Sequence, residues 1–251
     1  MFRNELPRLY ELRDLIDDLD SPDAYFQKFD CLLRDTPSIK QKYLALESTL
    51  QGMDSDSWGF LKSEAHTYLT KKCRKGRGWE QLFTILNQAR AYNYLRSIGC
   101  SGVAFIPRAT CNGIETPDLQ GEFCGTKVLC EVKTINISDL EVAARNSGVP
   151  CAIDRIDEKP LDPGFFNKLS DDIEKAKRQM EAFDNRSDVK RIVYIIVNFD
   201  DFWGDYKEHH YQQIDQFLTD NVRADIELVF HNQQTCFHKP ISMTSSTVVN
   251  E

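Results

Sequence analysis

Three ionisable residues in the middle of the chain have the types and the spacing that metal-assisted hydrolysis requires. Asp118 follows a proline, and Glu131 and Lys133 come later, in the apolar run KVLCEVKTI. Residues two apart on a strand point to the same face, so Glu131 and Lys133 project together. If residues 116–123 and 127–135 pair as a hairpin, Asp118 lies beside Glu131. We therefore expect two carboxylates and one ammonium group to converge at one end of a sheet.

Such a carboxylate pair favours a divalent metal ion. Two neighbouring carboxylates repel, and one takes up a proton unless a cation lies between them. Mg²⁺ binds through one or two carboxylates together with phosphate oxygens, and Mn²⁺ is the expected substitute. The ion lowers the pKa of a bound water and neutralises charge in the transition state, while Lys133 orients the hydroxide or stabilises the developing charge. The reaction that suits this set is hydrolysis of a phosphodiester.

The elements that must position these residues follow from apolar spacing and from helix-start and turn signals. We expect an all-helical N-terminal extension over residues 1–75, a second domain over 76–238 and a weakly ordered tail over 239–251. Expected helices in the first part cover residues 6–19, start at Ser21-Pro22-Asp23 and at Thr36-Pro37, and cover 57–72. The second part should contain helices 79–98, 163–183 and 211–218 and strands 102–107, 116–123, 127–135, 191–199 and 226–230. This order predicts an α/β fold with a mixed central sheet flanked by helices.

The stretch TPDLQGEF…VLCEVKT resembles the PD-(D/E)xK nuclease superfamily, which has the restriction-endonuclease-like fold. The resemblance implies that Asp118, Glu131 and the backbone carbonyl of Val132 bind the metal and that Lys133 assists the nucleophile. It also implies an acid on the helix before the first core strand, and Glu80 stands there as a catalytic and metal-binding candidate.

A second signature of some branches of that superfamily is incomplete here. These branches carry Gln-x-x-x-Tyr on the helix after the ExK strand, whereas this chain has Gln179 followed by Phe183, which lacks the hydroxyl. Gln179 is therefore only an accessory candidate, and ordinary helix surface is the competing interpretation.

A basic stretch before the helix 79–98 is a candidate nucleic-acid contact. It carries no acidic residue between its five cations, which are Lys71, Lys72, Arg74, Lys75 and Arg77. Such segregation favours contact with phosphate groups. A solvated linker between domains would have the same composition.

Each site residue also has a structural interpretation. Glu131 and Lys133 could form a salt bridge on an exposed strand face. The surrounding apolar run, however, is typical of an interior strand, where burial of a charged side chain is unfavourable unless the charge is paired or has a function. Asp118 could form a turn with Pro117, and Glu80 could complement the dipole of its helix.

Composition limits the class of protein. The net charge of −8 argues against a surface that is basic throughout, and no apolar run is long enough for a membrane span. The eight cysteines contain no CxxC pair, so we expect reduced thiols in a cytoplasmic protein rather than a zinc ribbon.

The expected function is a Mg²⁺-dependent nuclease, endonuclease or exonuclease, with DNA favoured over RNA as substrate. The alternative is a non-catalytic member of the same fold that binds nucleic acid or protein. An NTPase or phosphotransferase is disfavoured because the chain lacks GxxxxGK[ST] and GxGxxG. The N-terminal helices could hold a second copy of the chain or a protein partner, and no membrane contact is expected.

Overall fold

The computed structural model describes residues 2–72, 79–108, 115–135, 161, 163–197, 207–221, 225–232 and 241–242. The chain divides into two compact units, Met1–Ile98 and Gly99–Glu251. The boundary follows the helix that the sequence analysis placed at the start of the second domain. Each unit is described by itself.

The first unit is helical. Its helices are α1 (Pro7–Arg13), α2 (Phe29–Asp35), α3 (Pro37–Gln51), α4 (Ser55–His66) and α5 (Glu80–Ser97). The predicted start of α3 at Thr36-Pro37 is confirmed. The helix predicted from Ser21-Pro22-Asp23 is wrong, since these residues form a bend and turns, and α1 ends well before residue 19. The side chain of Asp54 fixes the start of α4 by accepting a hydrogen bond of 2.8 Å from the Ser57 N–H.

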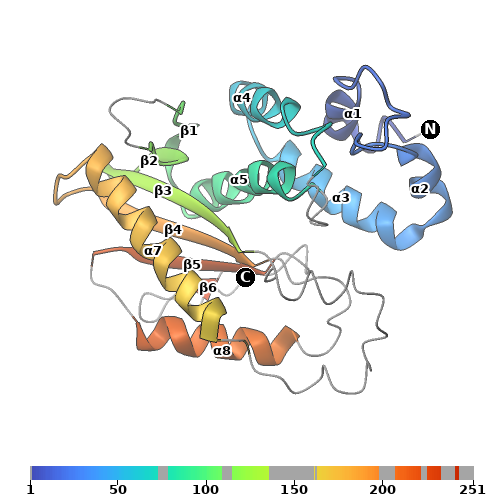
Figure 1. The fold of residues 1–251 in the computed structure, drawn as a ribbon. Coiled ribbons are helices and arrows are strands. Elements are labelled where there is room, and N and C mark those ends of the chain that lie inside the picture. The colour runs from blue at the N-terminus through green and yellow to red at the C-terminus, as the bar shows by residue number, and fades with distance from the viewer. Residues whose placement is uncertain are drawn as a thin grey trace. The chain divides into compact units, whose positions relative to one another are not determined.

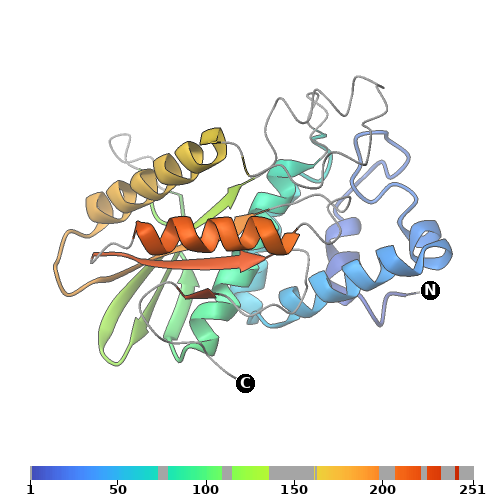
Figure 2. The same cartoon turned by 90° about the horizontal axis from the view of Figure 1, so that it is seen from below.

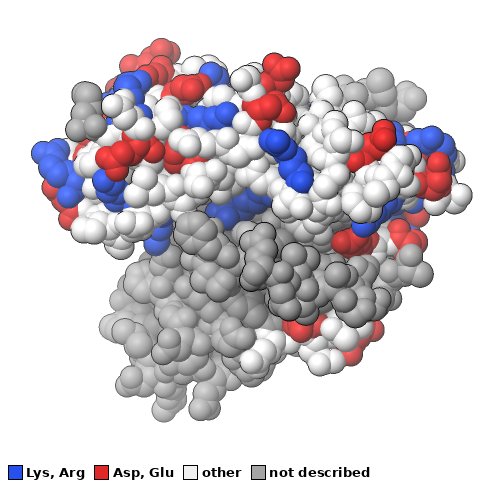
Figure 3. Space-filling view, turned by 180° about the vertical axis from the view of Figure 1, so that it is seen from behind, with Lys and Arg blue, Asp and Glu red and all other residues white. Residues whose placement is uncertain are grey.

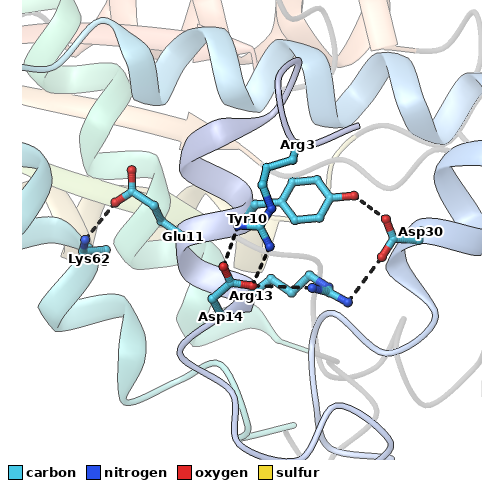
Figure 4. A network of polar contacts seen from close by, with 7 residues as sticks. All are labelled: Arg3, Tyr10, Glu11, Arg13, Asp14, Asp30 and Lys62. Carbon is cyan, nitrogen blue, oxygen red and sulfur yellow. Dashed lines mark hydrogen bonds and ion pairs between the residues drawn. The ribbon is translucent and has the colours of Figure 1, made fainter. Parts of the chain in front are cut away.

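A network of ion pairs and hydrogen bonds joins α1 to its neighbours (Figure 4). Arg3 donates to Asp14 at 2.6 Å, Arg13 lies 3.3 Å from Asp30 on α2, and the Tyr10 hydroxyl donates to the same Asp30. On the other side, Lys62 of α4 lies 2.8 Å from Glu11. The polar residues of α1 therefore tie it to α2 and α4, while Leu9 and Leu12 lie in the core.

The second unit is built on a mixed sheet whose strands are hydrogen-bonded in sequence order. The strands are β1 (Ser101–Phe105), β2 (Leu119–Phe123), β3 (Thr126–Ile135), β4 (Lys190–Val197), β5 (Glu227–Asn232) and β6 (Ile241–Ser242). β1, β2 and β3 are antiparallel, β4 and β5 continue parallel to β3, and β6 returns antiparallel. The predicted α/β class with a mixed sheet is confirmed.

The predicted hairpin of β2 and β3 closes through a two-residue turn. Phe123 pairs with Thr126, and the two residues between them, Cys124 and Gly125, have φ of 49° and 79°. Positive φ at both positions is the geometry of a type I′ turn, which matches the right-handed twist of the strands. This short connection fixes the register in which β3 meets β2.

Two helices cover one face of the sheet, as Figures 1 and 2 show. They are α7 (Pro163–Phe183), which packs on β3 and β4, and α8 (Lys207–Asp220). Leu169, Ile173 and Met180 of α7 pack with Ile214 of α8 and with apolar residues of the sheet. These positions form the buried apolar face of α7, whereas Phe183 at its end is 37% exposed.

The sequence analysis expected no membrane span and reduced cysteines, and the structure bears on both points. Within the described ranges, no helix has the length and apolar character that would let it cross a bilayer. Cys31, Cys100, Cys124 and Cys130 are free thiols. The other four cysteines lie outside the described residues.

Candidate active site

Asp118 lies where β2 begins and is held on both sides. Its backbone carbonyl accepts a hydrogen bond of 3.0 Å from the Ile106 N–H, beyond the end of β1. Its Oδ2 atom accepts a hydrogen bond of 2.8 Å from the Val132 N–H of β3. The pairing of Leu119 with Cys130, continued by one residue, places Asp118 opposite Glu131. Residues directly opposite each other in an antiparallel pair share a face, so the two carboxylates meet as predicted.

Glu131 is the centre of the cluster and is only 4% exposed. Its Oε1 atom accepts a hydrogen bond of 2.7 Å from Lys133, and its Oε2 atom accepts one of 3.0 Å from the Gln179 amide of α7. The same Gln179 nitrogen donates to the Thr116 carbonyl at 2.5 Å. Gln179 therefore joins α7, the segment before β2 and the buried carboxylate.

The backbone of Val132 also faces this cluster. In a β-strand the N–H and C=O of one residue point to the same side. Because the Val132 N–H bonds to Asp118, the Val132 carbonyl faces the side where the ladder with β2 has ended. Its side chain points to the opposite face and is buried, as is that of Cys130. The carbonyl is thus compatible with the ligand role that the resemblance implies.

Burial and mutual repulsion dominate the electrostatics of the carboxylate pair. Burial, and secondarily the charge of Asp118, raise the pKa of Glu131 to about 8, although Lys133 opposes this shift. Burial also raises the pKa of Asp118, against the opposing effects of the Val132 N–H and of Lys133. The two side chains lie within hydrogen-bonding reach of each other, so at neutral pH the pair shares a proton.

This arrangement fits a divalent cation. A cation would replace the shared proton and remove the repulsion between the carboxylates. The Oε1 atom of Gln179 is buried and has no hydrogen-bond partner among the residues that the structure describes, so it could accept a hydrogen bond from a water bound to such an ion. No group of three or more His, Cys, Asp or Glu residues that could hold a metal occurs in the described part of the chain. The donor set is therefore two carboxylates and a carbonyl, which suits Mg²⁺, an ion that keeps several waters.

Two predicted parts of the site belong to the first unit, whereas this cluster belongs to the second. Glu80 is the first residue of α5, in the first unit, and its role beside Asp118 stays a prediction. Lys71 and Lys72 are exposed, and their Nζ atoms lie 5.6 Å and 5.1 Å from the ring centroids of Tyr68 and Trp79. Arg74, Lys75 and Arg77 lie outside the described residues.

The sequence analysis missed two charged residues at the edge of the cluster. Lys175 of α7 lies 2.9 Å from Glu115, and the charge of Glu131 acts on Lys175 as well. The signal was available, because Lys175 precedes Gln179 by one helical turn and thus shares its face. Glu115, before the Pro-Asp pair, had no comparable signal.

No family model matches the chain, and no curated protein or solved structure matches it either.

Proposed function

We propose that this protein is a divalent-metal-dependent nuclease that hydrolyses phosphodiester bonds, with DNA favoured over RNA as the substrate. The observation that carries the proposal is the carboxylate pair of Asp118 and Glu131, beside Lys133 and at the point where the β2–β3 ladder ends. A buried pair of acids that raises its own pKa values is unfavourable for folding alone, so it points to a function.

Each side chain has a role in this proposal. Asp118, Glu131 and the Val132 carbonyl would hold Mg²⁺ or Mn²⁺, which supplies charge neutralisation and a water of lowered pKa. Lys133 donates to Glu131 at 2.7 Å and would hydrogen-bond the attacking water or a phosphoryl oxygen. Gln179 would keep Glu131 in place through its amide.

The order of elements supports the restriction-endonuclease-like assignment. An antiparallel meander of three strands leads through α7 into β4, which is parallel to β3 and almost fully buried. This is the order of helix and buried strand that the resemblance implies for the elements after the ExK strand.

A nucleic-acid contact outside the catalytic cluster would be local. Basic and acidic side chains are interspersed over the described surface in Figure 3, so that face shows no broad field of one sign. We propose that Lys71 and Lys72 bind backbone phosphates together with Arg74, Lys75 and Arg77. The partly exposed rings of Tyr68 and Trp79 beside these lysines would suit stacking on unpaired bases.

The test is cleavage of plasmid DNA, single-stranded DNA and RNA by the full chain, with Mg²⁺, with Mn²⁺ and with EDTA. Asp118→Asn, Glu131→Gln and Lys133→Met should each lower the rate at least about 100-fold while the fold is retained. Asp188→Asn, a change of an exposed acid in the same unit, should leave the rate unchanged. Binding of DNA without cleavage would favour the non-catalytic alternative, and cleavage by all three site variants at the wild-type rate would refute the assignment of the site.

A further inference from the structure

Lys175 is placed to act beside the carboxylate pair, although no motif marks it. It lies on α7 one turn before Gln179, and Gln179 binds Glu131. Its Nζ atom lies 2.9 Å from Glu115, a residue just before the Pro-Asp pair. The ion pair thus spans the same gap between α7 and residues 115–118 that Gln179 spans through the Thr116 carbonyl.

The pair of Lys175 and Glu115 is easily opened. The side chains are 54% and 62% exposed, respectively. Exposed ion pairs contribute little to stability, because water screens them and two long side chains must be ordered. Lys133 differs, since its side chain is 15% exposed and the side chain of its partner Glu131 is 6% exposed. Lys175 can therefore change partner at low cost, and Lys133 is held in place.

The charges around the site indicate what Lys175 would bind. Three acids and three cations act on one another there, namely Glu115, Asp118, Glu131, Arg108, Lys133 and Lys175. Asp172 also acts on Lys175, but it is paired with Lys168. With all six groups ionised, their formal charges cancel. A divalent cation on the carboxylate pair would leave a surplus of two positive charges, which matches two singly charged phosphodiesters. One would be the scissile group and the other its neighbour along the backbone.

We propose that Lys175 leaves Glu115 and binds the phosphate adjacent to the scissile phosphate, so that the site selects a polynucleotide over an isolated phosphodiester. This inference rests on the proposed nuclease function. A lysine suits the role, because its flexible stem carries a compact charge that can follow a backbone phosphate. Lys175 is then a substrate-binding residue, and the chemistry at the scissile group remains with Asp118, Glu131 and Lys133.

The test compares Lys175→Gln with Lys168→Gln. Lys168 is a matched control, because it lies on the same helix, is 56% exposed and pairs with Asp172 at 2.9 Å. Steady-state cleavage with Mg²⁺ is measured on a DNA oligonucleotide and on bis(p-nitrophenyl) phosphate, which has a single phosphodiester. Lys175→Gln should raise KM for the oligonucleotide about 5- to 10-fold, leave kcat within about twofold and lower the salt slope of KM by about one.

Two further results are required. Lys175→Arg should restore the KM for the oligonucleotide, and Lys175→Gln should cleave bis(p-nitrophenyl) phosphate as the wild type does. Equal KM values for the two glutamine variants would overturn the inference while the nuclease function stands. An equal loss on both substrates would also overturn it, since Lys175 would then act at the scissile group. A wild type that cleaves neither substrate would refute the nuclease proposal itself.

Discussion

Replacing Glu131 by glutamine should stabilise the metal-free protein, and the effect should grow with pH. The pKa of Glu131 is raised from an ordinary value of 4.5 to about 8, chiefly by burial. In the unfolded chain this group loses its proton near pH 4.5, whereas in the fold it keeps the proton until about pH 8. The unfolded state therefore binds fewer protons in this window, and the unfolding free energy falls as pH rises.

The magnitude follows from the same shift. A tenfold change in proton affinity is worth about 1.4 kcal/mol, so Glu131 should lower the unfolding free energy by on the order of 3 kcal/mol between pH 4.5 and 7. Asp118, whose pKa is also raised, acts in the same direction. Carboxylates with lowered pKa act in the opposite direction, but only at more acidic pH; they are Glu11, Asp14, Asp54, Glu115 and Asp184.

The assay is urea unfolding of the wild type and Glu131→Gln in EDTA at several pH values from 5 to 8. It is read by hydrogen exchange of the β4 amides, because β4 lies in the same unit as Glu131. The two proteins should be similar near pH 5 and should diverge as the wild type weakens, and histidine titration cancels in the difference. Mg²⁺ should restore the wild type at pH 8 and have little effect on Glu131→Gln. Parallel pH profiles of the unfolding free energy for the two proteins would show that ionisation of Glu131 does not destabilise the fold.

Three further predictions concern stability. Cys124→Asn should raise the unfolding free energy of the second unit by about 0.5–1 kcal/mol, because asparagine tolerates the positive φ of the turn better; a loss in urea unfolding would contradict this. Asp54→Ala should destabilise the first unit by about 1–2 kcal/mol through loss of the cap on the Ser57 N–H and of the hydrogen bond from the Tyr92 hydroxyl, whereas Asp56→Ala on the same helix serves as the control. Met180→Ala should cost about 2–5 kcal/mol, because Met180 is fully buried between α7 and the sheet, and an unchanged melting temperature would show that the core there repacks freely.

Periodicity predicted the sheet because its strands are bounded by turns and carry a regular pattern. The alternation around Glu131 placed the charges on one face and Cys130 on the other, and the register through Leu119 then brought Asp118 opposite Glu131. In the first unit, leucine spacing over residues 6–19 resembled one long helix. The helix ends at Arg13 because the following turns let Ile16 and Ala24 enter the core, and this is a tertiary effect that local spacing does not contain.

The contacts of the site that sequence reasoning missed cross long distances along the chain. Gln179 reaches both Thr116 and Glu131, and Lys175 reaches Glu115. These contacts depend on where α7 lies on the sheet and on how far it is rotated. Helix periodicity identifies the apolar face of α7, but it does not specify which polar residue at the border of that face meets a given strand.

The two-residue turn between β2 and β3 governs whether the protein has a reaction centre at all. A strand has two faces that alternate at every residue, so a slip of one position would turn Cys130 and Val132 toward α7 and move Glu131 and Lys133 to the opposite face, away from Gln179. The length of the turn at Cys124 and Gly125 therefore sets which side chains of β3 face α7, and one inserted residue would exchange the two faces along the whole strand. Natural variation in loop length would be expected elsewhere in this unit before it is found in that turn.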